Sequence, residues 1–293
     1  MKKLKHIILN ILTLGGYKRR KRPTKSENYI KDIRELTLNY QTKEIQKTQK
    51  NPLNKFGKKC FSQTDEDGIT LEILKRIGCI ENGYFAEFGP GDGMENNTLI
   101  LKSLGWKGFW IGGENLTINV KSNEKFYFMK DFISLKNIIE LTLEGKKKIN
   151  CVDLDVISFD LDGNDLFLVD ELLKNDFKPK LFIVEYNGKF PPPIKWNMNY
   201  NEKHIWDGSD YYGASLASFN ELFEKNDYKL ICCNAHTGSN AFFIKKEYLQ
   251  LFDDVPRDIE DIYVAPRYFL HNVFGSHSFS HPQSVKTINK LFE

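Results

Sequence analysis

The sequence predicts a doubly wound α/β fold, in which helices cover both faces of a mainly parallel sheet. Short apolar runs typical of strands alternate with amphipathic runs typical of helices between residues 60 and 250. Most strand runs are apolar at successive positions, which indicates burial on both faces. The first run ends in three closely spaced glycines, and loops at the carboxyl ends of parallel strands are where such sheets bind ligands.

Each expected element has a local reason. Residues 62–78 offer Ser62 or Thr64 as an N-cap, repeat apolar residues at helical spacing and end at Gly78. YFAEF at 84–88 has the composition of a buried strand. The same alternation predicts strands at 84–88, 108–113, 125–129, 156–160, 180–186, 228–233 and 240–244, the last as a hairpin partner, and helices at 62–78, 98–104, 135–143, 166–174 and 216–224.

Charge divides the chain into parts. Residues 1–59 hold 17 Lys and Arg against 4 Asp and Glu, whereas the remainder holds 25 basic and 35 acidic residues. We therefore expect a basic N-terminal arm over 1–59, helical or partly disordered, a main domain over 60–250, and a helical, aromatic C-terminal extension over 251–293. An acidic main domain argues against an enzyme that acts on nucleic acids.

Two features bear on the compartment. An apolar run at 7–14 is too short to span a bilayer, and a basic block follows at 18–22. This arm is either an amphipathic helix with a basic patch that rests on an anionic membrane surface, or a loosely docked arm. The five cysteines are odd in number and lack CxxC spacing, which argues against disulfides and zinc and favours a cytoplasmic location.

The glycine loop narrows the choice of ligand. Gly89, Gly91 and Gly93 are spaced GxGxG, and Glu87 stands just before them. A dinucleotide fingerprint has GxGxxG spacing and directs a helix N-terminus at a pyrophosphate. A carboxylate at this place instead suits a ligand without phosphate, such as S-adenosylmethionine with its sulfonium, ammonium and ribose hydroxyls. A tight turn with a surface glutamate is the alternative.

FDLDGND at 159–165 suggests a different enzyme. An apolar strand followed by DxDG also opens haloacid-dehalogenase-like phosphatases, in which the first Asp attacks phosphorus and Mg²⁺ is bound nearby. That motif usually begins its domain, whereas here strands and a glycine loop precede it. A later acidic pair should also follow a strand, but Asp253 and Asp254 follow what looks like a helix. The phosphatase stays as the alternative.

Several motifs in order resemble one family, the FkbM-like group of class I S-adenosylmethionine-dependent methyltransferases. The resemblance covers about residues 60–245 and implies a Rossmann-like, seven-stranded sheet with an antiparallel last strand. It also implies O-methylation of sugars or related molecules in glycan biosynthesis. The motifs are FSQTDEDGI (61–69), YFAEFGPGDG (84–93), SLGWKGFWIGGEN (103–115), ISFDLDGND (157–165), FIVEYN (182–187), WDGSDYYGAS (206–215) and GSNAFFI (238–244).

The resemblance gives the loop a cofactor to bind. The glycines would let backbone approach its methionine part and ribose, and Glu87 would accept from its ammonium. The acid that usually ends the second strand is displaced here to Glu114, after Gly112 and Gly113. The cofactor contacts are accordingly expected at Gln63, Glu87, Gly89, Gly91, Asp92, Gly93, Glu114 and Asp131.

Acidic residues end two further strands and suggest a metal. Asp160 and Asp162 follow the fourth strand, and Glu185 and Asn187 end the fifth. Strands one and four flank the switch point of a doubly wound sheet, so these oxygens should face the glycine loop. They suit Mg²⁺ or another hard cation, which would bind substrate hydroxyls and lower their pKa. A turn and helix cap over 162–164 is the equal alternative.

Aromatic residues and one histidine suggest the acceptor side. Tyr186 and WDGSDYYGAS offer a sugar platform or lid, with ordinary packing as the alternative. His236, between two strands, is the candidate general base, although lone loop histidines are more often structural. The expected catalytic residues are thus Asp160, Asp162 and His236, and the expected substrate contacts are Tyr186, Trp206, Asp207, Tyr211 and Tyr212.

These observations predict an S-adenosylmethionine-dependent O-methyltransferase that acts on a sugar, nucleotide sugar or glycan hydroxyl, with help from a divalent metal. The expected partners are this small-molecule or glycan substrate, a membrane surface through the basic arm, and further copies of the chain, but no nucleic acid. Besides the phosphatase, a non-catalytic, membrane-associated binding protein with the same fold is the alternative, since Glu114 is displaced.

Overall fold

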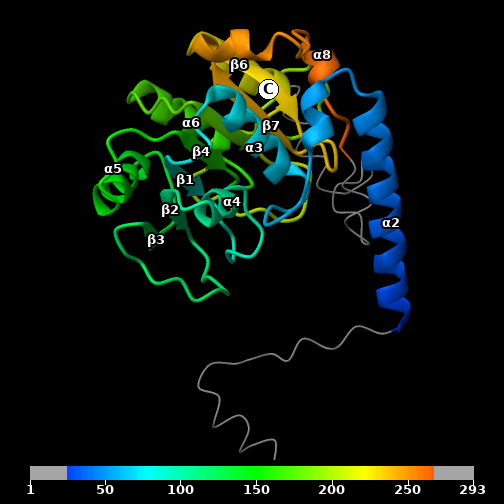
Figure 1. Ribbon diagram of the computed structural model, residues 1–293. Coiled ribbons are helices and arrows are strands. Elements are labelled where there is room, and N and C mark those ends of the chain that lie inside the picture. The colour runs from blue at the N-terminus through cyan, green and yellow to red at the C-terminus, as the bar shows by residue number, and fades with distance from the viewer. Residues whose placement is uncertain (1–24, 267–293) are drawn as a thin grey trace, which may run out of the picture. The chain divides into compact units, whose positions relative to one another are not determined.

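The computed structural model describes residues 25–266 of the chain (Figure 1). By internal contacts the chain divides into two units, Met1–Thr37 and Leu38–Glu293. Of the first unit, the structure describes the beginning of helix α2, Lys25–Thr48. The predicted membrane contact of the basic arm falls largely on residues 1–24, and most of the aromatic tail on 267–293; both lie outside the described residues.

The second unit is built around one seven-stranded sheet with the strand order β3-β2-β1-β4-β5-β7-β6 (Figure 1). The first five strands pair in parallel, whereas β7 lies antiparallel to both of its neighbours. This confirms the mainly parallel sheet with an antiparallel last strand. The strands are β1 Tyr84–Phe88, β2 Lys107–Gly112, β3 Phe126–Lys130, β4 Val156–Phe159, β5 Leu181–Glu185, β6 Tyr228–Cys233 and β7 Asn240–Lys245.

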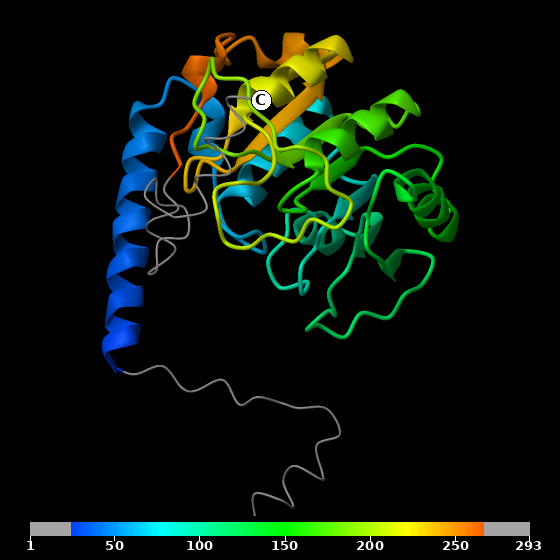
Figure 2. The same ribbon diagram turned by 180° about the vertical axis from the view of Figure 1, so that it is seen from behind.

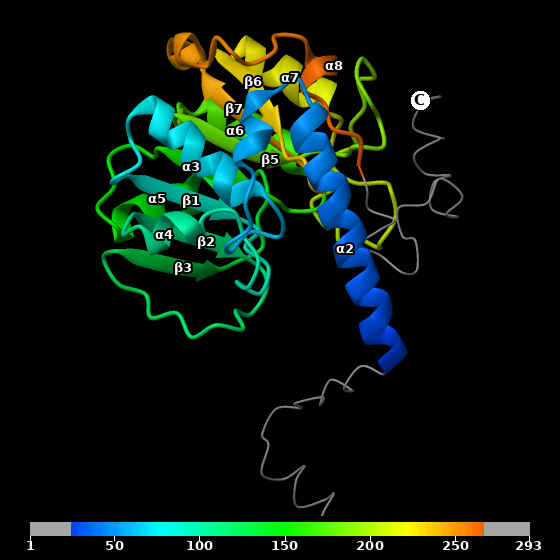
Figure 3. The ribbon, with the colours of Figure 1, turned by 45° about the vertical axis from the view of Figure 1, so that its right-hand side comes forward.

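Helices cover both faces of this sheet. α5, α6 and α7 pack in sequence on one face, and α3 with the short helices η1 and η2 lies on the other (Figure 3). Gly78 ends α3 in a left-handed conformation at φ +79°, as the sequence predicts. The helical bounds are η1 Pro52–Phe56, α3 Glu66–Ile77, α4 Leu99–Ser103, α5 Ile138–Lys148, α6 Asp165–Lys174, α7 Leu216–Lys225, η2 Lys246–Phe252 and α8 Ile259–Ile262.

Aromatic side chains fill the core beside the glycine loop. Phe88 stacks on Phe159 with ring centroids 4.5 Å apart and meets Phe109 edge to face. All three rings are fully buried, and they come from the adjacent strands β1, β4 and β2. Burying each ring stabilises the fold by about 2–3 kcal/mol. The carboxyl ends of the three strands that border the site are therefore held by a rigid core.

The compact unit begins earlier than residue 60. Leu53 is fully buried, and the Asn51 and Asn54 side-chain amides donate to the carbonyls of Ile231 and Cys233 on β6. Residues 38–59 thus pack with the domain instead of extending the arm. Their polar composition concealed this, because the buried groups are asparagines that satisfy a strand's backbone.

A long segment, residues 186–215, joins β5 to α7 without a helix or strand of its own (Figure 2, yellow-green). Its own small apolar cluster holds it in shape: Phe190 stacks on Trp196 at 4.5 Å, with Met198 buried beside them. Lys189 also forms an ion pair with the buried Asp210. This segment forms one wall of the candidate site.

Candidate functional site

The glycine loop after β1 needs glycine for two different reasons. Gly89, Gly91 and Gly93 all have positive φ, at +86°, +52° and +82°. A Cβ on Gly89 would lie 1.7 Å from the carbonyl oxygen of Asp160, so this glycine lets β1 and β4 end side by side. A Cβ on Gly91 would meet nothing within 4 Å. Gly91 therefore leaves open space, as a loop that cradles a ligand requires.

A cavity of about 470 Å³ lies at the carboxyl ends of β1, β2 and β4. The structure brings seven of the sequence-predicted site residues to its wall: Gly89, Gly91, Glu114, Asp131, Asp160, Asp162 and Trp206. Nine other residues complete the lining: Gly112, Gly113, Phe132, Ile133, Leu161, Asn164, Leu168, His204 and Ile205. No lysine or arginine occurs among these lining residues of the described chain, whereas four carboxylates do, so the charge of the lining disfavours a pyrophosphate.

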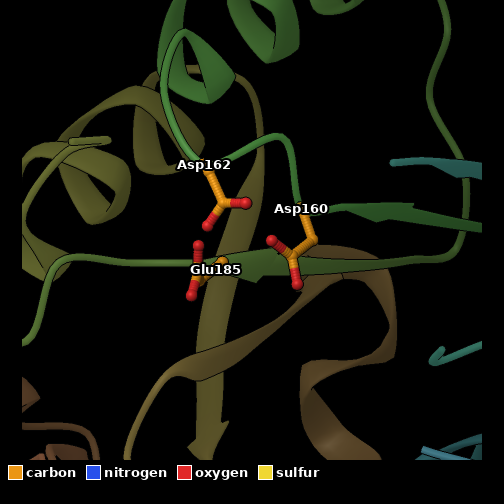
Figure 4. A group of neighbouring side chains, drawn as sticks. All are labelled: Asp160, Asp162 and Glu185. Carbon is orange, nitrogen blue, oxygen red and sulfur yellow. The ribbon is translucent and has the colours of Figure 1, made fainter. Parts of the chain in front are cut away.

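Three carboxyl groups converge at the β4 side of the cavity (Figure 4). Asp160, Asp162 and Glu185 each place one oxygen within 4.8 Å of the others. The sheet register accounts for this, because Phe159 is paired with Val184 and the next residues along the two parallel strands are Asp160 and Glu185. Asp162 turns back toward them from a left-handed conformation at φ +52°. Three oxygen donors at this spacing fit a hard divalent cation.

The electrostatics of this group favour a bound cation. Burial raises the pKa of Asp160 and Glu185 well above the usual range, and the neighbouring carboxylates raise both further. Burial likewise raises the pKa of Asp162 to about 6, with added repulsion from Asp165 and Glu114. A cation bound there would favour the ionised form of all three carboxyls and so lower their pKa.

The loop that carries Asp162 is shaped by other side chains. Asp165, at the start of α6, accepts from the backbone N–H groups of Leu161 and Gly163 at 2.8 and 2.9 Å. The Asn164 side chain exchanges two hydrogen bonds with the backbone of Asn201. The turn at 162–164 is therefore real, but no side chain caps the helix at Asn164, and the Asp162 carboxylate faces Asp160 and Glu185 instead.

Glu87 stabilises the segment that follows the glycine loop and is not among the residues that line the cavity. It is buried, and its two oxygens accept from the N–H groups of Asn97 and Thr98 and from the Thr98 hydroxyl. Burial raises its pKa to about 7. Glu87 therefore positions the segment after the glycines, and its predicted contact with the cofactor's ammonium stays a prediction.

The displaced acid after β2 does reach the cavity. Glu114 lines it together with Asp131, which follows β3. Asp131 accepts from the backbone N–H of Phe132, and that phenylalanine ring lines the cavity while half exposed. Two acids and an aromatic ring at neighbouring strand ends form a wall that can accept from ribose hydroxyls and cover a purine.

Other predicted cofactor residues lie outside the cavity lining. Gln63 is exposed, and the Asp92 carboxylate accepts from the Met94 N–H and the Thr117 hydroxyl. A Cβ on Gly93 would press against the side chains of Leu116 and Ile118 at 3.0–3.3 Å. Asp92 and Gly93 shape the loop, and any contact that the three residues make with a cofactor stays a prediction.

The same holds for several predicted metal and substrate residues. The Asn187 amide donates to the carbonyls of Asp210 and Tyr212 and accepts from the Lys189 N–H, so it organises its own segment. Tyr186 is buried and donates to the Val264 carbonyl. The buried Tyr212 and the residues Asp207 and Tyr211 also lie outside the first cavity. Asp207 and Tyr211 line a second one.

His236 lies in a buried polar network that joins two loops. Asp65, at the start of α3, accepts from the N–H groups of Ala235 and His236 at 3.0 Å. Its neighbour Glu66 accepts from the side-chain amides of Asn234 and Asn240. His236 is not among the residues that line either cavity. The acidic motif before α3 thus binds the β6–β7 loop, a pairing that no local pattern could reveal.

Sequence reasoning missed His204, Ile205 and Phe132. His204 and Ile205 immediately precede Trp206, the first residue of the predicted aromatic motif, so the stretch that lines the cavity begins two residues earlier than the motif. Phe132 directly follows Asp131 after β3, and its position at the carboxyl edge was a usable signal.

Asp253 and Asp254, the acidic pair considered for a phosphatase, are not among the residues that line this cavity. Asp253 and Asp254 follow η2, a 3₁₀ helix. Asp253 pairs with Arg257, and Asp254 pairs with Arg76 on α3.

Within residues 25–266, no helix is long and apolar enough to cross a membrane.

The chain matches no protein-family model and no curated protein. Among solved structures it is similar to three methyltransferases. Magnesium protoporphyrin IX methyltransferase from Synechocystis PCC 6803, with bound SAH, has a TM-score of 0.37 and 10% identity, over 82% of this chain and 99% of that one. An O-methyltransferase family 2 protein from Planctomyces limnophilus has a TM-score of 0.32 and 12% identity, over 56% of this chain and 51% of that one. Human N-acetylserotonin methyltransferase has a TM-score of 0.35 and 9% identity, over 59% of this chain and 50% of that one. At such low scores these likenesses say nothing about activity.

Proposed function

We propose that this chain is an S-adenosylmethionine-dependent O-methyltransferase that acts on a hydroxyl of a sugar, nucleotide sugar or glycan with help from a divalent cation. One observation carries the proposal: one cavity is bordered by the open glycine loop, by the acids Glu114 and Asp131, and by Asp160 and Asp162 of the three-carboxyl group. Each of these features suits a different part of the reaction.

The cofactor half of the cavity fits a cationic nucleoside. Gly91 and Gly113 leave room for a ligand against the backbone, since a Cβ on Gly113 would approach only Phe132, at 3.8 Å, and Asp131, at 4.0 Å. Glu114 and Asp131 supply acceptors for ribose hydroxyls, and Phe132 and Ile133 supply apolar surface for a purine. The acidic wall also attracts a sulfonium and an ammonium, whereas it repels phosphates.

The other half of the cavity, beside β4, offers ligands for a metal ion. Asp160, Asp162 and Glu185 would hold the ion, which when bound would lower the pKa of a coordinated hydroxyl. The residues' own task is to orient the acceptor oxygen toward the methyl group, because transfer requires an in-line approach. The rigid core below β1 and β4 keeps this side of the cavity fixed relative to the glycine loop.

Calorimetric titration with S-adenosylmethionine, with and without Mg²⁺, tests the cofactor site. Gly113→Leu should weaken binding at least tenfold, because the new side chain enters the cavity while the backbone there is not left-handed. Gly78→Ala is the control: it introduces a side chain at φ +79° in open space at the end of α3, and should bind as the wild type does. Absence of binding heat from folded wild-type protein would refute the proposal.

A further inference from the structure

Helix α2 exposes a row of large apolar side chains on one of its faces (Figure 3, blue). Four residues follow one another at the helical spacings of four, three and four: Tyr29, Ile33, Leu36 and Tyr40. Their side chains are 66%, 44%, 70% and 67% exposed in that order. We call this row the α2 stripe; it extends over about 16 Å of helix. An exposed apolar row of this kind indicates a surface that binds a partner.

Lysines continue the same face of α2 beyond both ends of the stripe. Lys25 stands four residues before Tyr29, and Lys43 stands seven residues after Leu36. Both lysines are exposed. An apolar face with a cation at each end suits the boundary between water and lipid, where lysine side chains reach the phosphate groups. The two tyrosines of the stripe favour the same boundary, because their rings are apolar and their hydroxyls polar.

A second copy of the helix fits the stripe less well than an anionic surface does. In a parallel pair of α2 helices, Lys25 and Lys43 would each lie beside their own equivalents. In an antiparallel pair centred on the stripe, Lys25 of each copy would lie beside Lys43 of the other. Both arrangements bring like charges together, which disfavours the pair. The charge of this face therefore indicates a negatively charged partner.

The charge of the neighbouring sequence agrees with this assignment. Residues 1–24, which lead directly into α2, hold eight Lys and Arg and no Asp or Glu. Beyond residue 59 the chain holds 35 acidic and 25 basic residues. An anionic membrane would therefore attract the arm and repel the main domain.

We propose that the α2 stripe docks on an anionic membrane, with its apolar side chains among the lipid headgroups and with Lys25 and Lys43 at lipid phosphates. The other faces of α2 are mainly polar, so the helix would lie along the surface. The stripe and the basic residues before it act together, because stable attachment takes two weak signals. This inference does not depend on the proposed methyltransferase function.

Sedimentation of the full chain with lipid vesicles tests the docking. We expect binding to phosphatidylcholine vesicles that contain phosphatidylglycerol, weakened by added salt, and no binding to phosphatidylcholine alone. Leu36→Asp should weaken binding about tenfold, because it places a charge within the stripe. Leu143→Asp is the matched control: this leucine is 54% exposed on α5, and its replacement changes the net charge equally. The control should bind nearly as the wild type does.

Two outcomes of the sedimentation would overturn the proposal. Equal losses in the two variants would show that net charge alone attracts the chain and that the stripe makes no contact. Equal binding to the two kinds of vesicle, or binding to neither, would remove the anionic membrane as the partner.

Hydrogen exchange locates the contact on the chain. Anionic vesicles should slow the exchange of backbone amides in Lys25–Thr48 and leave those in Ile138–Lys148 unchanged. Exchange in α2 that vesicles do not slow would contradict the proposal. Light scattering without lipid should give the same mass for the wild type and for Leu36→Asp. A wild-type dimer that Leu36→Asp dissociates would show that a second copy covers the stripe, and would overturn the membrane assignment.

Discussion

At the scale of single residues, the site depends on carboxyl groups that the fold removes from water fully, as at Glu87, or in part, as at Asp160, Asp162 and Glu185. Glu87 holds the segment after the glycines, and Asp160, Asp162 and Glu185 form the three-carboxyl group, of which the two aspartates line the cavity. Burial raises the pKa of each of the four. Such groups oppose folding when ionised, so their presence indicates a task other than stability.

Glu87 should make stability depend on pH. Its pKa is about 7 in the folded protein against 4.5 for an unperturbed glutamate. Between these values the folded state keeps a proton that the unfolded state releases, so the free energy of unfolding falls as pH rises, by about 3 kcal/mol in total. Glu87→Gln should reduce this slope by that contribution in denaturant titrations from pH 4.5 to 8, whereas the part due to the other three carboxyls should remain. The exposed Glu140→Gln should keep it, and an unchanged slope in Glu87→Gln would contradict the account.

The three-carboxyl group should respond to a divalent cation. Mg²⁺ at about 100 times its dissociation constant should stabilise the wild type by about 2.7 kcal/mol, seen as a higher Tm than in EDTA. Asp160→Asn should lose this response, because a ligand and a charge are removed. Asp170→Asn on the exposed side of α6 is the matched control and should keep it. Equal Mg²⁺ effects in both variants would argue against a metal at this place.

At the scale of elements, the positions of the strands could be predicted well, whereas the contacts between distant loops could not. The apolar runs predicted every strand to within about two residues, because burial on both faces leaves a clear pattern. The convergence of Asp160 with Glu185 also followed from their places after adjacent parallel strands. The contact of Asp65 with the loop of His236 did not, since it joins residues 171 positions apart through a backbone N–H.

The loop between β1 and α4 gives a prediction at this scale. Gly89→Ala should destabilise the protein by about 3–5 kcal/mol, because its Cβ would overlap the carbonyl oxygen of Asp160 and push β1 and β4 apart. Gly105→Ala is the control, with φ +91° but open space around it, and should cost about 1 kcal/mol. Denaturant midpoints measure both. Equal losses would show that the backbone conformation, and not the close approach, requires glycine at position 89.

At the scale of the whole molecule, the charge composition predicted an acidic main domain but placed the start of that domain too late in the chain. The excess of acid beyond residue 59 agrees with a cavity lined by four carboxylates and no lysine or arginine among its described residues. The arm, however, was expected to reach residue 59, whereas the compact unit starts at Leu38. Charge counts average over residues, and they cannot show that two asparagines bind a distant strand.

The antiparallel strand β7 also bears on how the chain is made. Among the described strands β6 pairs with β7 alone, and β7 lies between β6 and β5. During synthesis β6 leaves the ribosome first, yet its place in the sheet does not exist until Asn240–Lys245 has followed it. A chain cut before Asn240 would leave β6 with no neighbour and β5 with an open edge ready to join another molecule. The edge of β5 is therefore covered only once this strand has been translated.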